Sequence, residues 1–207
     1  MKKLLRELKI VPYLAFHPFK GFWELKHEGG SLPAAVILLV LLVLSSVAKG
    51  FYSGYLFNQN NGARFDAVKS VLVTVFLFVL WCVANWCLTC LFDGEGNLRD
   101  IIKATAYALS PLILFQILAI PASHIFILRE AAFYSLIGDA GYFWTGALLL
   151  ISVLVTHQYR LLKGLLMIVC IILGMCVLAY IALLFFNLIG QMWGFLEVLT
   201  RELSDRI

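Results

Sequence analysis

VLVTVFLFVLWCVANWCLTCLF, residues 71–92, is a run of 22 residues without a charged side chain. An α-helix needs about 20 predominantly apolar residues to cross the hydrocarbon core of a bilayer. Its apolar side chains occur all round the helix instead of along one stripe, which is typical of a helix surrounded by lipid. The run predicts a membrane span over about residues 68–92, in which the polar Asn85 faces a neighbouring helix and pairs with it.

Four further stretches of the chain have the same character. They predict spans over about residues 32–48, 104–128, 141–156 and 163–189. Pro111 and Pro121 lie inside the third of the five spans, and proline removes a backbone hydrogen bond, so we expect a kinked or broken helix there. The short alternating segments of a membrane β-barrel do not occur in the sequence. The predicted fold class is therefore all-α, a polytopic membrane helical bundle with about five transmembrane helices.

The composition excludes an ordinary soluble domain. Hydrophobic residues make up 62% of the 207 residues and charged residues 14%, against about 25% charged in soluble domains. The mean hydropathy is +0.94. The 16 basic residues are spread along the chain, so no nucleic-acid partner is predicted. All five cysteines lie in apolar runs, which argues against a disulfide framework.

The distribution of basic residues predicts the topology. Five spans place the termini on opposite sides, with ten Lys and Arg on the N-terminal side and six on the other. The positive-inside rule then places the N-terminus in the cytoplasm, in a multi-pass protein of the cell (inner/plasma) membrane. We expect a cytoplasmic or interfacial amphipathic segment over residues 1–31, a membrane domain over residues 32–190 and a polar tail over residues 191–207.

Three polar stretches, residues 17–23, 92–98 and 156–160, fall on the predicted cytoplasmic side. The middle one contains Asp93-Gly94-Glu95-Gly96, which we interpret as a tight turn in which glycine supplies positive φ before a helix capped by Asn97. A metal site of His17, Asp93, Glu95 and His157 is the alternative, but no ligand spacing supports it. No metal, no other cofactor and no catalytic residue are predicted.

Taken together, these stretches resemble those of bacterial members of the Yip domain family, the five-span relatives of eukaryotic Rab-interacting membrane proteins. His-Pro-Phe-x-Gly-Phe, found in many bacterial members before the first span, stands here at residues 17–22. The family's Gly-Tyr motif with a following proline is similar to residues 106–111, where alanine replaces the glycine. Residues 85–86, 92–96 and 157–159 also resemble family stretches, and the likeness covers residues 16–189. It implies a fold and a topology. The Rab partner of the eukaryotic relatives is not implied, since a bacterial cytoplasm offers none, and the acidic residue of the eukaryotic motif is absent here.

The sequence therefore favours a non-enzymatic membrane scaffold or accessory protein that acts through helix packing and cytoplasmic-face contacts. Its expected partners are the lipid bilayer and other membrane proteins, with an oligomeric state that the sequence leaves open. A small transporter using the proline-broken span and a metal-dependent membrane enzyme are the two alternatives. The residues expected to bind a partner or shape the motif are His17, Pro18, Phe19, Gly21, Asp93, Gly94, Glu95, Tyr107, Pro111 and His157.

Overall fold

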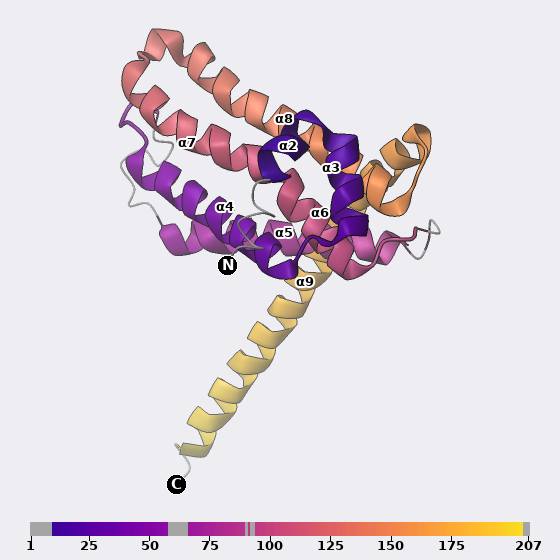
Figure 1. Ribbon diagram of the computed structural model, residues 1–207. Helices are drawn as coiled ribbons and strands as arrows, with labels where there is room; N and C mark the ends of the chain where they lie inside the picture. Colours follow the sequence, from indigo (N-terminus) through magenta and orange to yellow (C-terminus); the bar gives the residue numbers. More distant parts are fainter. Residues whose placement is uncertain (1–9, 58–65, 90, 92–93, 205–207) are drawn as a thin grey trace.

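The computed structural model describes residues 10–57, 66–89, 91 and 94–204 (Figure 1). Within these residues the chain is helical and contains no strand. The helices, in chain order, are α2 (Ile10–Phe16), α3 (Pro18–Glu24), η1 (Leu25–Gly29), α4 (Leu32–Tyr52), α5 (Ala67–Thr89), α6 (Leu98–Ala108), α7 (Ser110–Ile125), η2 (Leu128–Glu130), α8 (Ala131–His157) and α9 (Leu161–Ser204).

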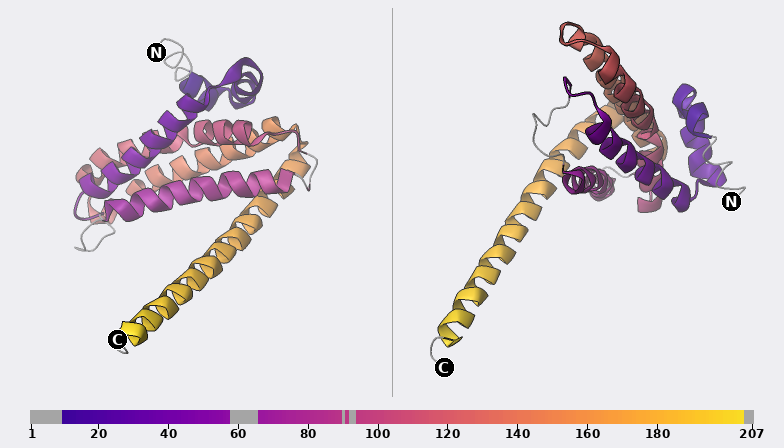
Figure 2. Two further views of the ribbon diagram at one scale, coloured as in Figure 1. Left: turned by 90° about the horizontal axis from the view of Figure 1, so that it is seen from below. Right: turned by 90° about the vertical axis from the view of Figure 1, so that its left-hand side faces the viewer.

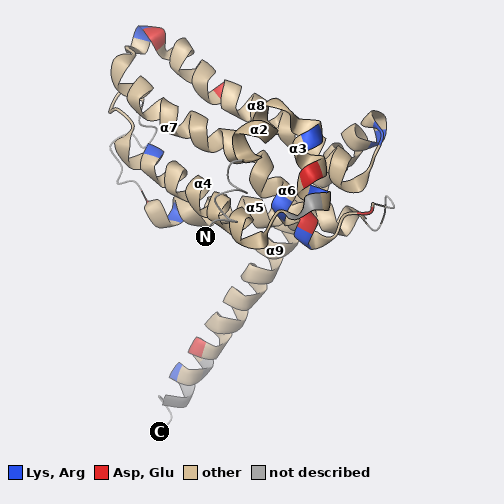
Figure 3. Ribbon diagram, in the orientation of Figure 1, with Lys and Arg blue, Asp and Glu red and all other residues tan. Residues whose placement is uncertain are grey.

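Five helical segments of the described chain are long and apolar enough to cross a membrane, which confirms the predicted all-α polytopic bundle. They are Leu32–Tyr52, Ala67–Thr89, Leu98–Ile125, Leu128–His157 and Leu161–Val198. At one end of the bundle α5 and α8 finish while α6 and α9 begin, and we call this the His157 end. Figure 3 shows that charged residues gather at this end and are sparse along the helices between the two ends.

The third span is broken, as expected from its prolines. Helix α6 ends at Ala108 and α7 begins at Ser110. Pro111 has no N–H to pair with the carbonyl of Tyr107 four residues earlier, and the Ser110 hydroxyl donates to that carbonyl instead, at 2.6 Å. Pro121 lies inside α7 without ending it. The break therefore needs no exposed backbone group, because a side chain next to the proline satisfies the freed carbonyl.

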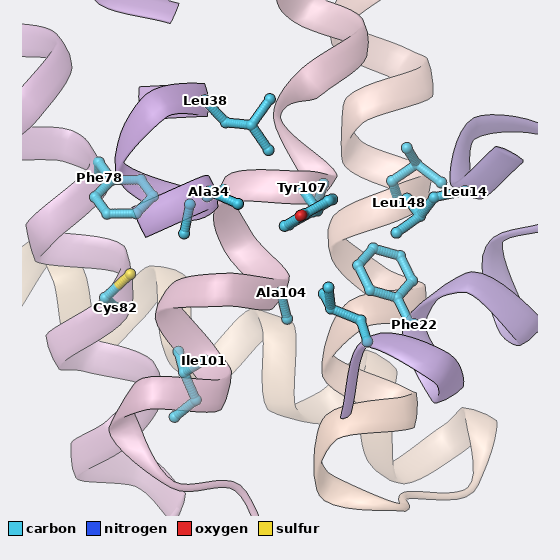
Figure 4. Packing of buried hydrophobic residues seen from close by; sticks show 14 residues of the cluster. Leu14, Phe22, Ala34, Leu38, Phe78, Cys82, Ile101, Ala104, Tyr107 and Leu148 are labelled. Atoms are coloured by element: carbon cyan, nitrogen blue, oxygen red, sulfur yellow. The ribbon is translucent and has the colours of Figure 1, made fainter. Parts of the chain in front are cut away.

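The N-terminal helices belong to the packed core of the bundle. Helices α2 and α3 lie beside each other, and α3 packs on α8. Leu14 and Phe22 are almost fully buried and lie in one cluster with Tyr107 (Figure 4). The aromatic rings of Phe19 and Trp23 on α3 are exposed. The described part of the N-terminal segment is thus anchored on the bundle by buried apolar side chains.

Helix α9 is 44 residues long, about 66 Å at 1.5 Å per residue. Its first turns pack on α5 and α8, where Met167 and Ile171 are fully buried. Beyond this contact it leans away from the other helices (Figures 1 and 2). Residues 191–204, expected as a polar tail, continue the same helix.

Candidate functional site

His157, the last residue of α8, lies at the centre of a cluster of side chains at the His157 end. Its side chain is 2% exposed, and its Nε2 atom lies 3.1 Å from Oδ1 of Asn85 on α5, which is itself 3% exposed. A carbonyl oxygen can only accept, so the imidazole carries its proton on Nε2 and donates it. This bond confirms that Asn85 pairs with a neighbouring helix. It joins two spans at the point where both end.

The loop before α6 lies against the His157 ring through its glycines. A Cβ atom placed on Gly94 would lie 2.6 Å from Nδ1 of His157, and one placed on Gly96 would lie 2.7 Å from Cε1. These separations are far shorter than van der Waals contacts. Neither glycine has positive φ, so the expectation that they serve the backbone conformation of a turn is wrong. They are required because the loop approaches the imidazole too closely for any side chain.

Tyr159 covers the His157 ring from the segment that connects α8 to α9. Gln158, at φ 56°, ends α8 in the left-handed conformation and reverses the chain. The Tyr159 ring then stacks on the imidazole with 5.3 Å between the centroids and 19° between the planes. Lys163 Nζ lies 4.5 Å from the centroid of the Tyr159 ring, within the range of a cation–π contact.

Lys26 joins the N-terminal segment to this cluster. Its ammonium group donates to the carbonyl of Thr156 at 2.9 Å and lies 3.8 Å from a carboxylate oxygen of Glu95. The Lys26 side chain is 16% exposed and that of Glu95 is 63% exposed. The cluster therefore joins four segments of the chain and presents the Glu95 carboxylate outward from a tightly packed base.

The His-Pro-Phe-x-Gly-Phe stretch shapes the turn between α2 and α3. Pro18 lies in the first turn of α3, where its missing N–H removes no helical hydrogen bond. The exposed His17 ring stacks on Tyr13. A Cβ on Gly21 would lie 3.0 Å from the Cα of Leu14, so glycine is what allows the two helices to approach.

Replacing Gly21 with valine is expected to lower the free energy of unfolding by about 1–3 kcal/mol, because a branched side chain forces α2 away from α3. Thermal unfolding of the purified protein in detergent measures the effect. Gly146→Val is the control, since the space around the Cβ position of Gly146 on α8 is empty. An equal loss in both variants would show that helix propensity, and not the close approach, determines the result.

The structure brings together part of the predicted set and leaves the rest apart. Gly94, Glu95 and His157 meet in the cluster, whereas Tyr107 and Pro111 lie at the break of the third span. His17 connects α2 to α3, and Pro18, Phe19 and Gly21 lie within α3. Asp93 lies outside the described residues. Among the residues that the structure describes, no group of three or more His, Cys, Asp or Glu side chains is placed to bind a metal ion.

Sequence reasoning did not include Lys26, Tyr159 or Gly96 in the site. Tyr159 and Gly96 lie within the polar stretches that the sequence singled out, next to the predicted His157 and Glu95. Lys26 lies outside these polar stretches. Its position in the cluster depends on how the N-terminal segment packs on α8.

Comparison with known proteins adds one match. The family model described as the Yip1 domain matches residues 13–185 of the chain. This range begins in α2 and ends within α9, so it includes every residue of the cluster. No curated protein and no solved structure matches the chain.

Proposed function

The chain belongs to the Yip1 domain family, and on that premise we propose that it is a non-enzymatic membrane scaffold whose His157 end faces the cytoplasm and contacts other membrane proteins. The Glu95 carboxylate, held outward on a buried base, is the observation that carries the proposal. A contact residue on a rigid base loses little conformational freedom when a partner binds. The exposed Phe19 and Trp23 of α3 add apolar contact area in the N-terminal segment that also carries Lys26.

The first test removes the acidic side chains of the loop. In the variant Asp93→Ala/Glu95→Ala, recovery of a crosslinked partner is expected to fall at least fivefold while membrane insertion stays the same. Insertion is expected to persist because an exposed ion pair such as Lys26–Glu95 contributes only about 0–1 kcal/mol to stability. A photo-crosslinking residue placed at Phe19 in both proteins provides the measurement.

Two controls make this test specific. Glu130→Ala removes an exposed carboxylate at the opposite end of the bundle and is expected to leave the recovery unchanged. A crosslinker at Phe143, which is 79% exposed on α8, reports contacts that do not involve the His157 end. Unchanged recovery from position 19 in the Asp93→Ala/Glu95→Ala variant would overturn the proposal.

A small transporter is the second candidate, and one observation favours it. A cavity of about 370 Å³ lies within the bundle and is lined by Leu109 at the break of the third span and by Gln116. Most of the residues that line it are apolar, which suits a hydrated solute poorly. Counterflow of a solute into proteoliposomes is the measurement that supports transport, and its absence removes this candidate. In the part of the chain that the structure describes, no comparable observation favours a metal-dependent enzyme.

A further inference from the structure

The cavity lies at the depth of the hydrocarbon core. On α5 it is lined from Thr74 to Trp81, which stand 8 to 15 residues before the last residue of that helix, Thr89. At 1.5 Å per residue these positions lie about 12–22 Å from the His157 end. A bilayer core is about 30 Å thick, so the cavity is near its middle. Water-soluble molecules do not reach this depth through lipid, whereas acyl chains are already there.

The cavity opens sideways between α5 and α8. Its inner wall contains Phe78, which is 8% exposed, and the half-buried Leu149. Leu77 and Tyr142 also line it but are 50% and 59% exposed, so they form its mouth. Met175 of α9 lies at the edge of the cavity, and α9 leans away from the bundle beyond this level (Figure 2). The mouth therefore faces the lipid.

Three polar side chains of the lining are already paired within the protein. Gln116 Oε1 accepts a hydrogen bond from Ser45 at 2.6 Å. The Thr74 hydroxyl donates to the carbonyl of Ser70 at 2.9 Å, and the Ser46 hydroxyl lies 3.3 Å from that of Ser70. Trp81 Nε1 has no acceptor among the described residues, but it is buried and exposes no surface to an occupant. A hydrocarbon occupant therefore breaks none of these hydrogen bonds.

The depth and the apolar lining of the cavity indicate the kind of occupant. A mostly apolar space of about 370 Å³ that opens toward lipid suits a hydrocarbon chain. An empty apolar space of this size forfeits dispersion contacts on all its walls. A single flexible chain entering from the side restores them.

We propose that this cavity binds one acyl chain of a bilayer phospholipid. The inference is independent of the proposed contact function at the His157 end. The acyl chain is then a component of the folded bundle that fills the space between α5 and α8. It enters at the mouth formed by Leu77 and Tyr142.

Trp81 provides a direct test because it lines the cavity. In a chain that keeps only this tryptophan, with the other four replaced by phenylalanine, phosphatidylcholine brominated at mid-chain is titrated into the delipidated protein in detergent. Bromine quenches tryptophan fluorescence on contact. We expect saturable quenching at about one lipid per protein. A chain that keeps only Trp144, which is 43% exposed on α8, is expected to show quenching that does not saturate.

Thr74→Phe fills the cavity and is expected to reduce the saturable quenching of Trp81 at least fivefold. Val73→Phe is the matched control, since Val73 neighbours Thr74 on α5, is 47% exposed and does not line the cavity. Thr74→Ser keeps the cavity open and is expected to behave like the unaltered Trp81-only chain.

Equal quenching in Thr74→Phe and Val73→Phe, both with native-like helical content, overturns the proposal. Non-saturable quenching of Trp81 does so as well, because it indicates only the lipid annulus. Brominated free fatty acid is the competing source of an acyl chain. If it saturates Trp81 at a lower concentration than the phospholipid does, the assignment to a bilayer phospholipid is wrong.

Discussion

Replacing Gly94 with alanine is expected to lower the free energy of unfolding by about 1–3 kcal/mol, because the added Cβ overpacks the His157 cluster. The methyl group would lie 2.6 Å from His157 Nδ1, 2.6 Å from the Tyr159 hydroxyl and 2.9 Å from Thr89. None of these neighbours is free to withdraw, since His157 is bonded to Asn85 and Tyr159 is stacked on the imidazole. Thermal unfolding in detergent measures the loss.

Gly138→Ala is the matched control for this substitution. Gly138 lies inside α8, and nothing lies within 4 Å of its Cβ position. Alanine is favoured over glycine in a helix by about 1 kcal/mol, so this variant is expected to be as stable as the natural chain or more so. If Gly94→Ala leaves the stability unchanged, the loop does not approach His157 as closely as the 2.6 Å separation requires.

Breaking the bond between Asn85 and His157 is expected to have a comparably large effect. Asn85→Ala leaves the buried Nε2–H of His157 without its acceptor, which costs about 1–3 kcal/mol. His157→Ala and the double variant complete a double-mutant cycle. Residues that share such a bond are expected to have an interaction energy of about 0.5–3 kcal/mol. The free energy of unfolding therefore falls less in the double variant than the sum of the losses in the two single variants.

Asn187→Ala provides the control for this cycle. Asn187 is exposed on α9, and its removal is expected to change the free energy of unfolding by less than about 0.5 kcal/mol. If the losses in free energy of unfolding of Asn85→Ala and His157→Ala add up to that of the double variant, the bond is contradicted, because only the effects of independent sites are additive.

The sequence was sufficient to predict the number of spans and the break in the third one. Long uncharged runs have few alternatives in lipid, because only internally paired helices satisfy their backbones there. The break follows from Pro111, whose missing N–H acts locally. The extent of α9 was not predictable in the same way, since the polar residues after Gly190 are equally compatible with a helix that leaves the bilayer.

The candidate site was predictable only in part. Glu95 and His157 stand out as polar residues between apolar runs. Their convergence depends on the packing of α5, α6 and α8, which no local pattern encodes. For the same reason the glycines of the loop were assigned to backbone conformation, although their contact with the imidazole is what requires them. Lys26 was missed because its partners lie 69 and 130 residues further along the chain.

The proposed function requires that the His157 end faces the cytoplasm, where its cluster contacts a partner. Cysteine labelling measures this side directly. In chains whose five native cysteines are first replaced by alanine, Glu95→Cys and Glu130→Cys place one thiol at each end of the bundle. We expect a membrane-impermeant maleimide to label position 130 on intact spheroplasts and position 95 only after they are permeabilised. Labelling of position 95 on intact spheroplasts, with position 130 protected, would contradict the claim.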